Sequence, residues 1–119
     1  MLPKSAKSKG RRLQQEVARD LAKAFNLSPE LIHQAIMGES GVDVMVLGPD
    51  ALKTGNLGIE CKNQEALRLW PAWAQTKANA VKAKRNPVLV TTRNNHEVLA
   101  VLPWKDLLLI LQEAGRCCK

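Results

Sequence analysis

Asp43, Glu60 and Lys62 are charged residues placed in two segments that are otherwise apolar enough to form buried strands. Two carboxylates that lie close together raise each other's pKa unless a cation joins them. Carboxylate oxygens with room for water are ligands that suit Mg²⁺ or Mn²⁺. A lysine beside such a ligand can position or deprotonate an attacking water, or neutralise a phosphate oxygen. Together these residue types would support metal-assisted hydrolysis of a phosphodiester.

Two strands must bring these side chains together, and their sequences predict how. Apolar and β-branched residues predict strands over 42–47 and 57–62, with turn residues between them. Because side chains alternate between the two faces of a strand, Glu60 and Lys62 point to one face and the apolar residues of 57–62 to the other. In an antiparallel hairpin the start of the first strand lies beside the end of the second. Asp43 is then expected next to Glu60 and Lys62.

The remaining segments predict a sheet flanked by helices. Helical spacing of apolar residues and helix-stop signals predict helices over 13–25, 28–36, 65–84 and 104–114. Two further apolar runs predict strands over 88–92 and 97–103. The element order α(α)ββαββα combines antiparallel hairpins with one crossover helix. This order is typical of an α/β fold with a central mixed sheet.

Composition indicates the class of partner. The 119 residues carry a formal net charge of +7, which favours a polyanion such as nucleic acid or an anionic membrane surface. Residues 1–12 contain basic but no acidic residues and predict a flexible basic arm, followed by a single domain over 13–119. No apolar run reaches the roughly 18 residues of a membrane-spanning helix. The three cysteines lack a disulfide or zinc spacing, which favours reduced thiols and a cytoplasmic location.

The stretches SGVDVMV and GNLGIECKN, followed by WPAWAQTKANA and PVLVTTR, are similar to the PD-(D/E)XK nuclease superfamily. The resemblance is closest to the small phage and archaeal Holliday junction resolvases, and it runs from about Gly10 to Pro103. Glu60-Cys61-Lys62 is its most specific element, and Val42 stands where the family has proline. The resemblance implies a restriction-endonuclease-like core, a DNA substrate and a role in DNA recombination.

The resemblance also implies roles for individual residues. The catalytic centre would consist of Glu16 on the first helix, Asp43, Glu60 and Lys62. Asp43, Glu60 and the backbone carbonyl of Cys61 would bind Mg²⁺, for which Mn²⁺ can substitute. Lys62 would position or activate the nucleophile, and Glu16 would complete the site through a second metal or a water.

Other residues are candidates for supporting roles. Glu39 competes with Glu16, because it lies shortly before the aspartate of the first strand. Ser40 is a candidate for a hydrogen bond near the scissile phosphate. Gln75 on the long helix, or Gln64 before it, is a candidate to orient water or phosphate. The alternative is that Glu16 and Gln75 are ordinary solvent-facing residues of their helices.

Basic residues outside the motif are expected to bind phosphates. They fall into two clusters without acidic neighbours: Lys4, Lys7, Lys9, Arg11 and Arg12, and then Lys77, Lys82, Lys84 and Arg85. Because each neutralised phosphate releases counterions, binding should weaken as salt rises. The scarcity of aromatic residues disfavours a single-strand binder that stacks bases. The lack of a Gly-rich phosphate loop disfavours a nucleotide cofactor.

These features predict a Mg²⁺-dependent endonuclease that resolves four-way DNA junctions, and the resemblance implies products with 5′-phosphates. Two matched cuts across a junction imply a homodimer. One alternative is a nicking, mismatch-directed or restriction-type nuclease on the same scaffold. A second is a basic DNA-binding module whose nuclease site is idle. An RNA-acting nuclease also stays open, although the sequence has no recognisable feature that reads a 2′-hydroxyl.

Overall fold

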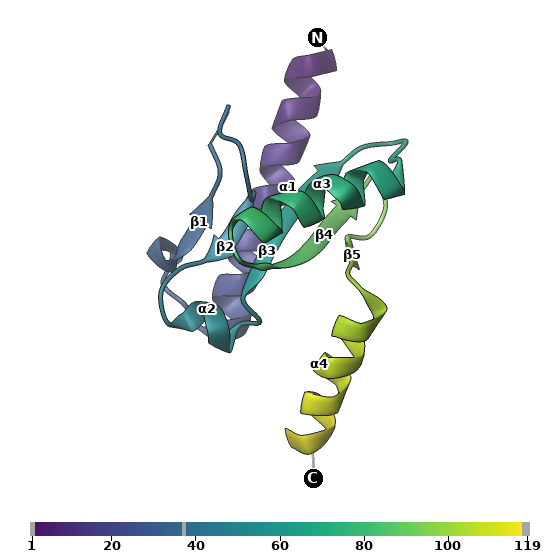
Figure 1. Cartoon of the computed structure of the whole chain (residues 1–119). Helices are drawn as coiled ribbons and strands as arrows, with labels where there is room; N and C mark the ends of the chain where they lie inside the picture. The colour runs from purple at the N-terminus through teal and green to yellow at the C-terminus, as the bar shows by residue number, and fades with distance from the viewer. Residues whose placement is uncertain (1, 37, 118–119) are drawn as a thin grey trace.

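The computed structural model describes residues 2–36 and 38–117, and its strands form one five-stranded sheet in the order β1-β2-β3-β4-β5. Helices lie against both faces of this sheet (Figure 1). The elements along the chain are α1 (Leu2–Phe25), the 3-10 turn η1 (Pro29–Leu31), β1 (Ile32–Gln34), β2 (Val44–Val46), α2 (Asp50–Lys53), β3 (Leu57–Asn63), α3 (Leu69–Lys82), β4 (Asn86–Thr92), β5 (Leu99–Val101) and α4 (Trp104–Cys117).

The sheet is mixed, as the sequence predicted. β3 and β4 are parallel and are joined by the crossover helix α3, whereas every other neighbouring pair is antiparallel. β2 pairs with β3 at Val44 and Ile59. The backbone N–H of Asp43 extends this pairing by donating to the carbonyl of Ile59 at 3.0 Å. The predicted antiparallel arrangement of these two strands is therefore confirmed.

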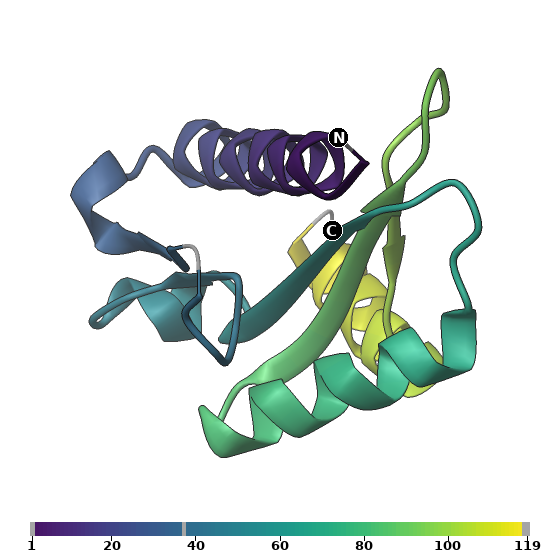
Figure 2. The ribbon, with the colours of Figure 1, turned by 90° about the horizontal axis from the view of Figure 1, so that it is seen from above.

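The main hydrophobic core lies between α1 and the sheet. Leu13 and Val17 of α1 are buried against apolar side chains from the central strands, including Ile59, Cys61 and Val88. Figure 2 shows α1 on one face of the sheet and α3 on the other. The apolar residues of β3 thus face the core, and the alternation predicted for this strand is confirmed.

The second face of the sheet is covered by α3. Small side chains on its buried side, Ala72, Thr76 and Ala80, let the helix approach the strands closely. Gly58 in β3 lies directly under the end of this helix, because a Cβ atom there would be 3.1 Å from the Cβ of Ala80 and 2.9 Å from that of Arg85, which follows the helix. A larger residue at position 58 would therefore push the helix away from the sheet.

Residues 28–36 were predicted to form a short helix, and this prediction is wrong. Only η1 follows Ser28, and the chain then enters β1, which pairs with β2. Pairing and the burial of Ile32 stabilise the extended form. A helix of this length is marginal without tertiary support, so the strand prevails.

The amino-terminal segment also differs from the prediction. Instead of a flexible arm over residues 1–12, α1 begins at Leu2 and continues into the predicted helix without a break. Pro3 is tolerated because the first turn of a helix does not need its N–H. Gly10, inside the helix, costs about 1 kcal/mol relative to alanine but does not interrupt it. Any basic residue that binds a phosphate here is therefore carried on a helix.

The last elements end the sheet and extend away from it. β5 is shorter than predicted and pairs with β4 alone, and α4 then projects beyond the sheet (Figure 1). Within the described residues, no helix combines the length and apolarity that crossing a membrane would require.

Candidate active site

Asp43, Glu60 and Lys62 line one open pocket with a volume of about 340 Å³. Asp43 directly precedes β2, and the other two residues belong to β3, so the antiparallel pairing of these strands brings them together. The convergence that the sequence predicted is thus present in the structure. The remaining lining residues come from α1, from the segment between β1 and β2, and from β3: Gly10, Arg11, Gln14, Ala35, Ile36, Gly38, Glu39 and Cys61.

A backbone hydrogen bond holds the Asp43 carboxylate in place. The N–H of Cys61 donates to Oδ2 of Asp43 at 2.8 Å. The backbone of Asp43 is itself fixed by its hydrogen bonds to Ile59 of β3 on one side and to Ala35, which directly follows β1, on the other. The carboxylate is therefore oriented before any ligand binds.

Glu60 is the more deeply buried of the two acidic residues, with only 6% of its surface exposed. Its side chain points to the α3 side of the sheet, where Nδ2 of Asn79 donates to Oε1 at 3.2 Å. Asn79 was not among the predicted site residues. The predicted Gln75 lies one turn earlier on the same helix, so the helix was identified but the contacting residue was not.

The two carboxyl groups influence each other's protonation. Burial raises the pKa of Asp43 above its ordinary value, while the hydrogen bond from Cys61 and the charge of Lys62 oppose this increase. Burial and the negative charge of Asp43 raise the pKa of Glu60, against the effects of Asn79 and Lys62. A cation stabilises the charged form of two adjacent acids whose pKa values are raised.

Cys61 itself is unsuited to nucleophilic chemistry. Burial, together with the charges of Asp43 and Glu60, raises the pKa of its thiol. Since the thiolate is the reactive form of cysteine, this side chain stays a neutral part of the core. Only its backbone takes part in the site.

The donor set fits a hard divalent cation. Within the described part of the chain, no three His, Cys, Asp or Glu side chains form a cluster that could hold a metal ion. Asp43 and Glu60 nevertheless supply two carboxylates, and the backbone carbonyl of Cys61 belongs to the same strand. Mg²⁺ is commonly held by one or two carboxylates, with water and substrate phosphate as its remaining ligands. These residues therefore fit Mg²⁺ or Mn²⁺ better than Zn²⁺, which prefers nitrogen and sulfur.

The two competing glutamates lie in different places. Glu39 lines the pocket with Asp43 and Lys62, whereas Glu16 lines a neighbouring pocket with Arg12, Arg19 and Thr92. Successive helical residues turn by 100°, so Gln14 rather than Glu16 faces the Asp43 pocket. The structure thus does not bring Glu16 together with the other three predicted catalytic residues.

Hydrogen bonds hold both Glu39 and Gln14 at the pocket. Oε1 of Glu39 accepts from the N–H of Ile36 at 2.9 Å, and Oε2 lies 3.1 Å from Nε2 of His33. The hydrogen bond from Ile36 and the nearby His33 lower the pKa of Glu39. Gln14 donates from Nε2 to the carbonyl of Ala35 at 2.7 Å, which ties α1 to the same segment. Glu39 is therefore a third acid at this pocket, ionised more readily than the buried pair.

The predicted supporting residues have mixed positions. Ser40 is exposed and does not line the pocket. Gln64 and Gln75 line an adjacent pocket with Lys62 and Arg68. Lys62 therefore lines both pockets, and Gln64 and Gln75 line the second one with it.

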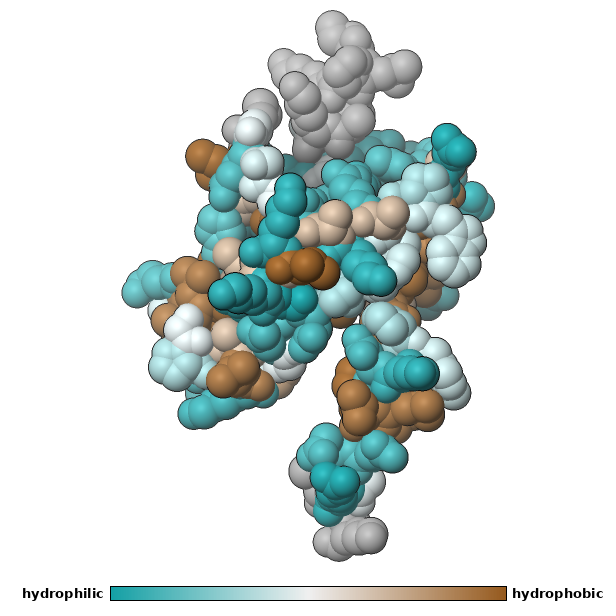
Figure 3. Space-filling view, viewed as in Figure 1, coloured by the Kyte–Doolittle hydropathy of each residue, from teal (hydrophilic) through white to brown (hydrophobic). Residues whose placement is uncertain are grey.

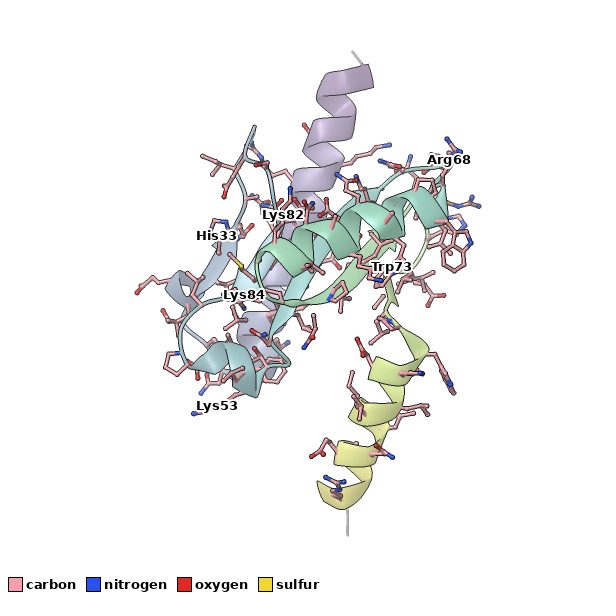
Figure 4. All side chains as sticks on the ribbon, viewed as in Figure 1. His33, Lys53, Arg68, Trp73, Lys82 and Lys84 are labelled. Atoms are coloured by element: carbon pink, nitrogen blue, oxygen red, sulfur yellow. The ribbon has the colours of Figure 1, made fainter. Side chains whose placement is uncertain are left out.

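The basic residues differ in how free they are to bind phosphate. Arg11 lines the Asp43 pocket, and Arg12 lines the neighbouring one. Lys77, Lys82 and Lys84 are exposed, the last two at the end of α3 (Figure 4). Lys9 is half-buried, while the side chains of Lys4 and Lys7 lie outside the described residues.

Arg85 has a structural role that the sequence did not indicate. Its Nη1 donates to the carbonyl of Val46 at 2.6 Å, which links the segment after α3 to β2. Because this guanidinium is half-buried and already bonded, it is less available for phosphate than Lys82 or Lys84.

No protein-family model, curated protein or solved structure matches the chain. The resemblance to PD-(D/E)XK nucleases therefore stays a prediction based on the residues themselves. The fold is described by its own features: an α/β arrangement with a five-stranded mixed sheet between helices.

Proposed function

We propose that this protein is a metal-dependent endonuclease that hydrolyses phosphodiester bonds in DNA, with four-way junctions as its preferred substrate. The observation that carries the proposal is the meeting of Asp43, Glu60 and Lys62 at one open pocket of a chain with a net charge of +7. Placing one buried and one partly buried acid side by side destabilises a fold, so their position beside a lysine at a pocket favours a chemical role.

Each residue has a role in this proposal. Asp43, Glu60 and the Cys61 carbonyl would hold Mg²⁺, and the ion would lower the pKa of bound water and polarise the phosphoryl oxygen. Lys62 positions or deprotonates the attacking water, or neutralises a phosphate oxygen. Asn79 orients Glu60 through its hydrogen bond.

Basic residues around the pocket would hold the DNA backbone. Arg11 is placed to contact the phosphate nearest the acids, because it lines the same pocket. Exposed lysines at the end of α3 would contact phosphates farther along. Since these contacts do not read bases, the preference for a junction would come from its shape and from two sites in a homodimer that cut opposite strands.

The test uses a labelled four-way junction and a linear duplex of the same sequence, each with Mg²⁺ or Mn²⁺. The wild-type protein should cut the junction faster, and Lys62→Ala should slow cutting by about 10²–10⁴-fold, the usual effect of losing a general acid or base. Glu60→Gln should abolish cutting as well. Both variants should still bind the junction in a gel-shift assay, and Glu97→Gln, which alters an exposed glutamate, serves as the matched control.

Three outcomes would contradict parts of the proposal. Equal cutting of junction and duplex would reject the junction preference but keep the nuclease. Binding without cutting under either metal would identify a DNA-binding module with an idle site. Cutting that survives Glu60→Gln would remove this pocket as the catalytic centre.

A further inference from the structure

A second surface of the molecule has the opposite character to the pocket. α4 contains 14 residues, and Trp104, Leu108 and Leu111 follow one another on one side of it at helical spacing. These side chains are 66%, 39% and 55% exposed, respectively. Figure 3 shows hydrophobic residues gathered on α4, where it projects from the rest of the molecule. We call the side of α4 that carries these three residues the apolar stripe.

The charges on α4 disfavour two kinds of partner. The described charged residues of the helix are Lys105, Asp106, Glu113 and Arg116, two of each sign, in a chain that is otherwise strongly basic. Helices that bind a membrane surface or nucleic acid concentrate lysine and arginine on their polar side. The neutral polar side of α4 fits a protein partner instead, because neither a phosphate backbone nor an anionic headgroup would gain from it.

The same chain carries an apolar groove that could receive such a stripe. Leu69, Trp70 and Trp73 at the start of α3, together with the 101–104 segment, line a hollow of about 220 Å³ next to the base of α4. Trp70 is 75% exposed there. The projecting apolar helix of one copy can therefore pack into the apolar groove of a second copy.

The open edge of the sheet also favours a second copy. In the described sheet, β5 is an outermost strand, and its sequence Leu99-Ala100-Val101 has neither a charge nor a proline. Proteins usually protect exposed edges with such residues, because an unprotected edge pairs with another strand. Two identical edges related by a two-fold axis meet as antiparallel strands, the pairing that β5 already makes with β4.

We infer that β5 and the apolar stripe of α4 form the interface of a two-fold symmetric dimer, in which each stripe packs on the partner's Trp70 groove. β5, the apolar stripe and the groove at the start of α3 would form the apolar centre of this interface, and a polar rim would surround it. Each exposed tryptophan adds on the order of 100 Å² of buried area. This inference does not rest on the nuclease proposal.

Two leucines of α4 provide a matched pair for the test. Leu111 belongs to the apolar stripe, whereas Leu109 lies on the charged side of the helix with Lys105 and Glu113. Their exposed fractions are nearly equal, 55% and 60%. Replacing either with glutamate therefore makes the same chemical change at equally exposed positions, and neither replacement disturbs the core.

Molar mass in solution is the measurement. Sedimentation velocity at micromolar concentration should give the wild-type protein and Leu109→Glu twice the chain mass of 13.1 kDa, and Leu111→Glu the mass of one chain. Circular dichroism checks that both variants keep the fold. Leu111→Met keeps an apolar side chain at this position and should therefore retain twice the mass of one chain.

The contrary results are equally distinct. A wild-type protein of 13.1 kDa throughout the concentration range would overturn the inference. So would two variants that both remain dimers, since the dimer would then use another surface. A monomer that co-sediments with anionic phosphatidylserine vesicles, and loses this binding in Leu111→Glu, would assign the stripe to a membrane.

Discussion

The pocket between β2 and β3 buries charge, whereas the surface made by β5 and α4 exposes apolar side chains. Both arrangements oppose the usual distribution of residues in a folded protein, and both cost free energy that the isolated chain does not recover. Glu60 is 6% exposed in the first region, and Trp104 is 66% exposed in the second. We therefore propose that each region is completed by something outside the chain. A cation and a phosphate suit the first, and apolar protein surface suits the second.

The largest expected change in activity concerns Asn79, which donates a hydrogen bond to the buried Glu60. If the buried carboxylate serves metal binding, Asn79→Ala should weaken Mg²⁺-dependent cutting by about 10–100-fold, as the loss of an orienting hydrogen bond usually does. The half-maximal Mg²⁺ concentration should rise. Because the hydrogen bond from Asn79 lowers the pKa of Glu60, its loss should also shift the acid limb of the pH–rate profile to higher pH.

Gln75→Ala provides the control for this prediction, since it changes an amide on the same helix without touching Glu60. It should leave the Mg²⁺ requirement and the pH profile unchanged. If both variants behave alike, Asn79 only stabilises the helix, and the charge in this region would need another explanation.

A smaller effect distinguishes Glu39 from Glu16. Glu39 lines the pocket that contains Asp43, so Glu39→Gln should reduce the cutting rate by about tenfold. Glu16→Gln should have no measurable effect, because Glu16 lines the neighbouring pocket. Steady-state rates on the labelled junction measure both. If Glu16→Gln slowed cutting and Glu39→Gln did not, the bound substrate would have to contact Glu16 from its neighbouring pocket.

The smallest expected effect concerns stability. Because the folded state raises the pKa of Glu60 above its ordinary value of 4.5, the folded protein binds a proton that the unfolded chain releases. Stability is then lost as pH rises from that ordinary value through the raised one. Glu60→Gln should raise the Tm by a few degrees at neutral pH, and this gain should vanish below about pH 4.

Thermal melts across this pH range, without added metal, test the prediction. The control Leu109→Glu changes α4 and not the pocket. Its Tm should depend on pH as that of the wild-type protein does, between neutral pH and the ordinary Glu60 pKa of 4.5. A Glu60→Gln variant that is less stable at neutral pH would show that the buried carboxylate contributes to stability, so that the contrast between the two regions would not hold.

The part of the site that follows from strand geometry could be predicted from the sequence. Side-chain alternation fixes which face of β3 carries Glu60 and Lys62. The turn residues before Leu57 indicate that the chain reverses, which places Asp43 beside them. These are local rules, and they do not depend on how the helices pack. The α/β class and the mixed sheet follow from the same patterns.

The rest depends on tertiary packing, which local patterns do not contain. Whether Gln14 or Glu16 faces the pocket is set by the rotation of α1 about its axis, and Leu13 and Val17 fix that rotation by packing on the sheet. β1 exists because it pairs with β2. Asn79 reaches Glu60 only because α3 lies close to the strands.

The close approach of α3 to β3 depends on Gly58, a residue that does not line the pocket. Gly58 leaves the space into which Ala80 fits, and Asn79 is the neighbour of Ala80 on the same helix. The spacing between α3 and the sheet thus determines whether Asn79 can form its hydrogen bond with Glu60. Random mutagenesis followed by selection for altered metal requirement should therefore recover changes at positions 58 and 80, although neither side chain would meet the ion or the DNA.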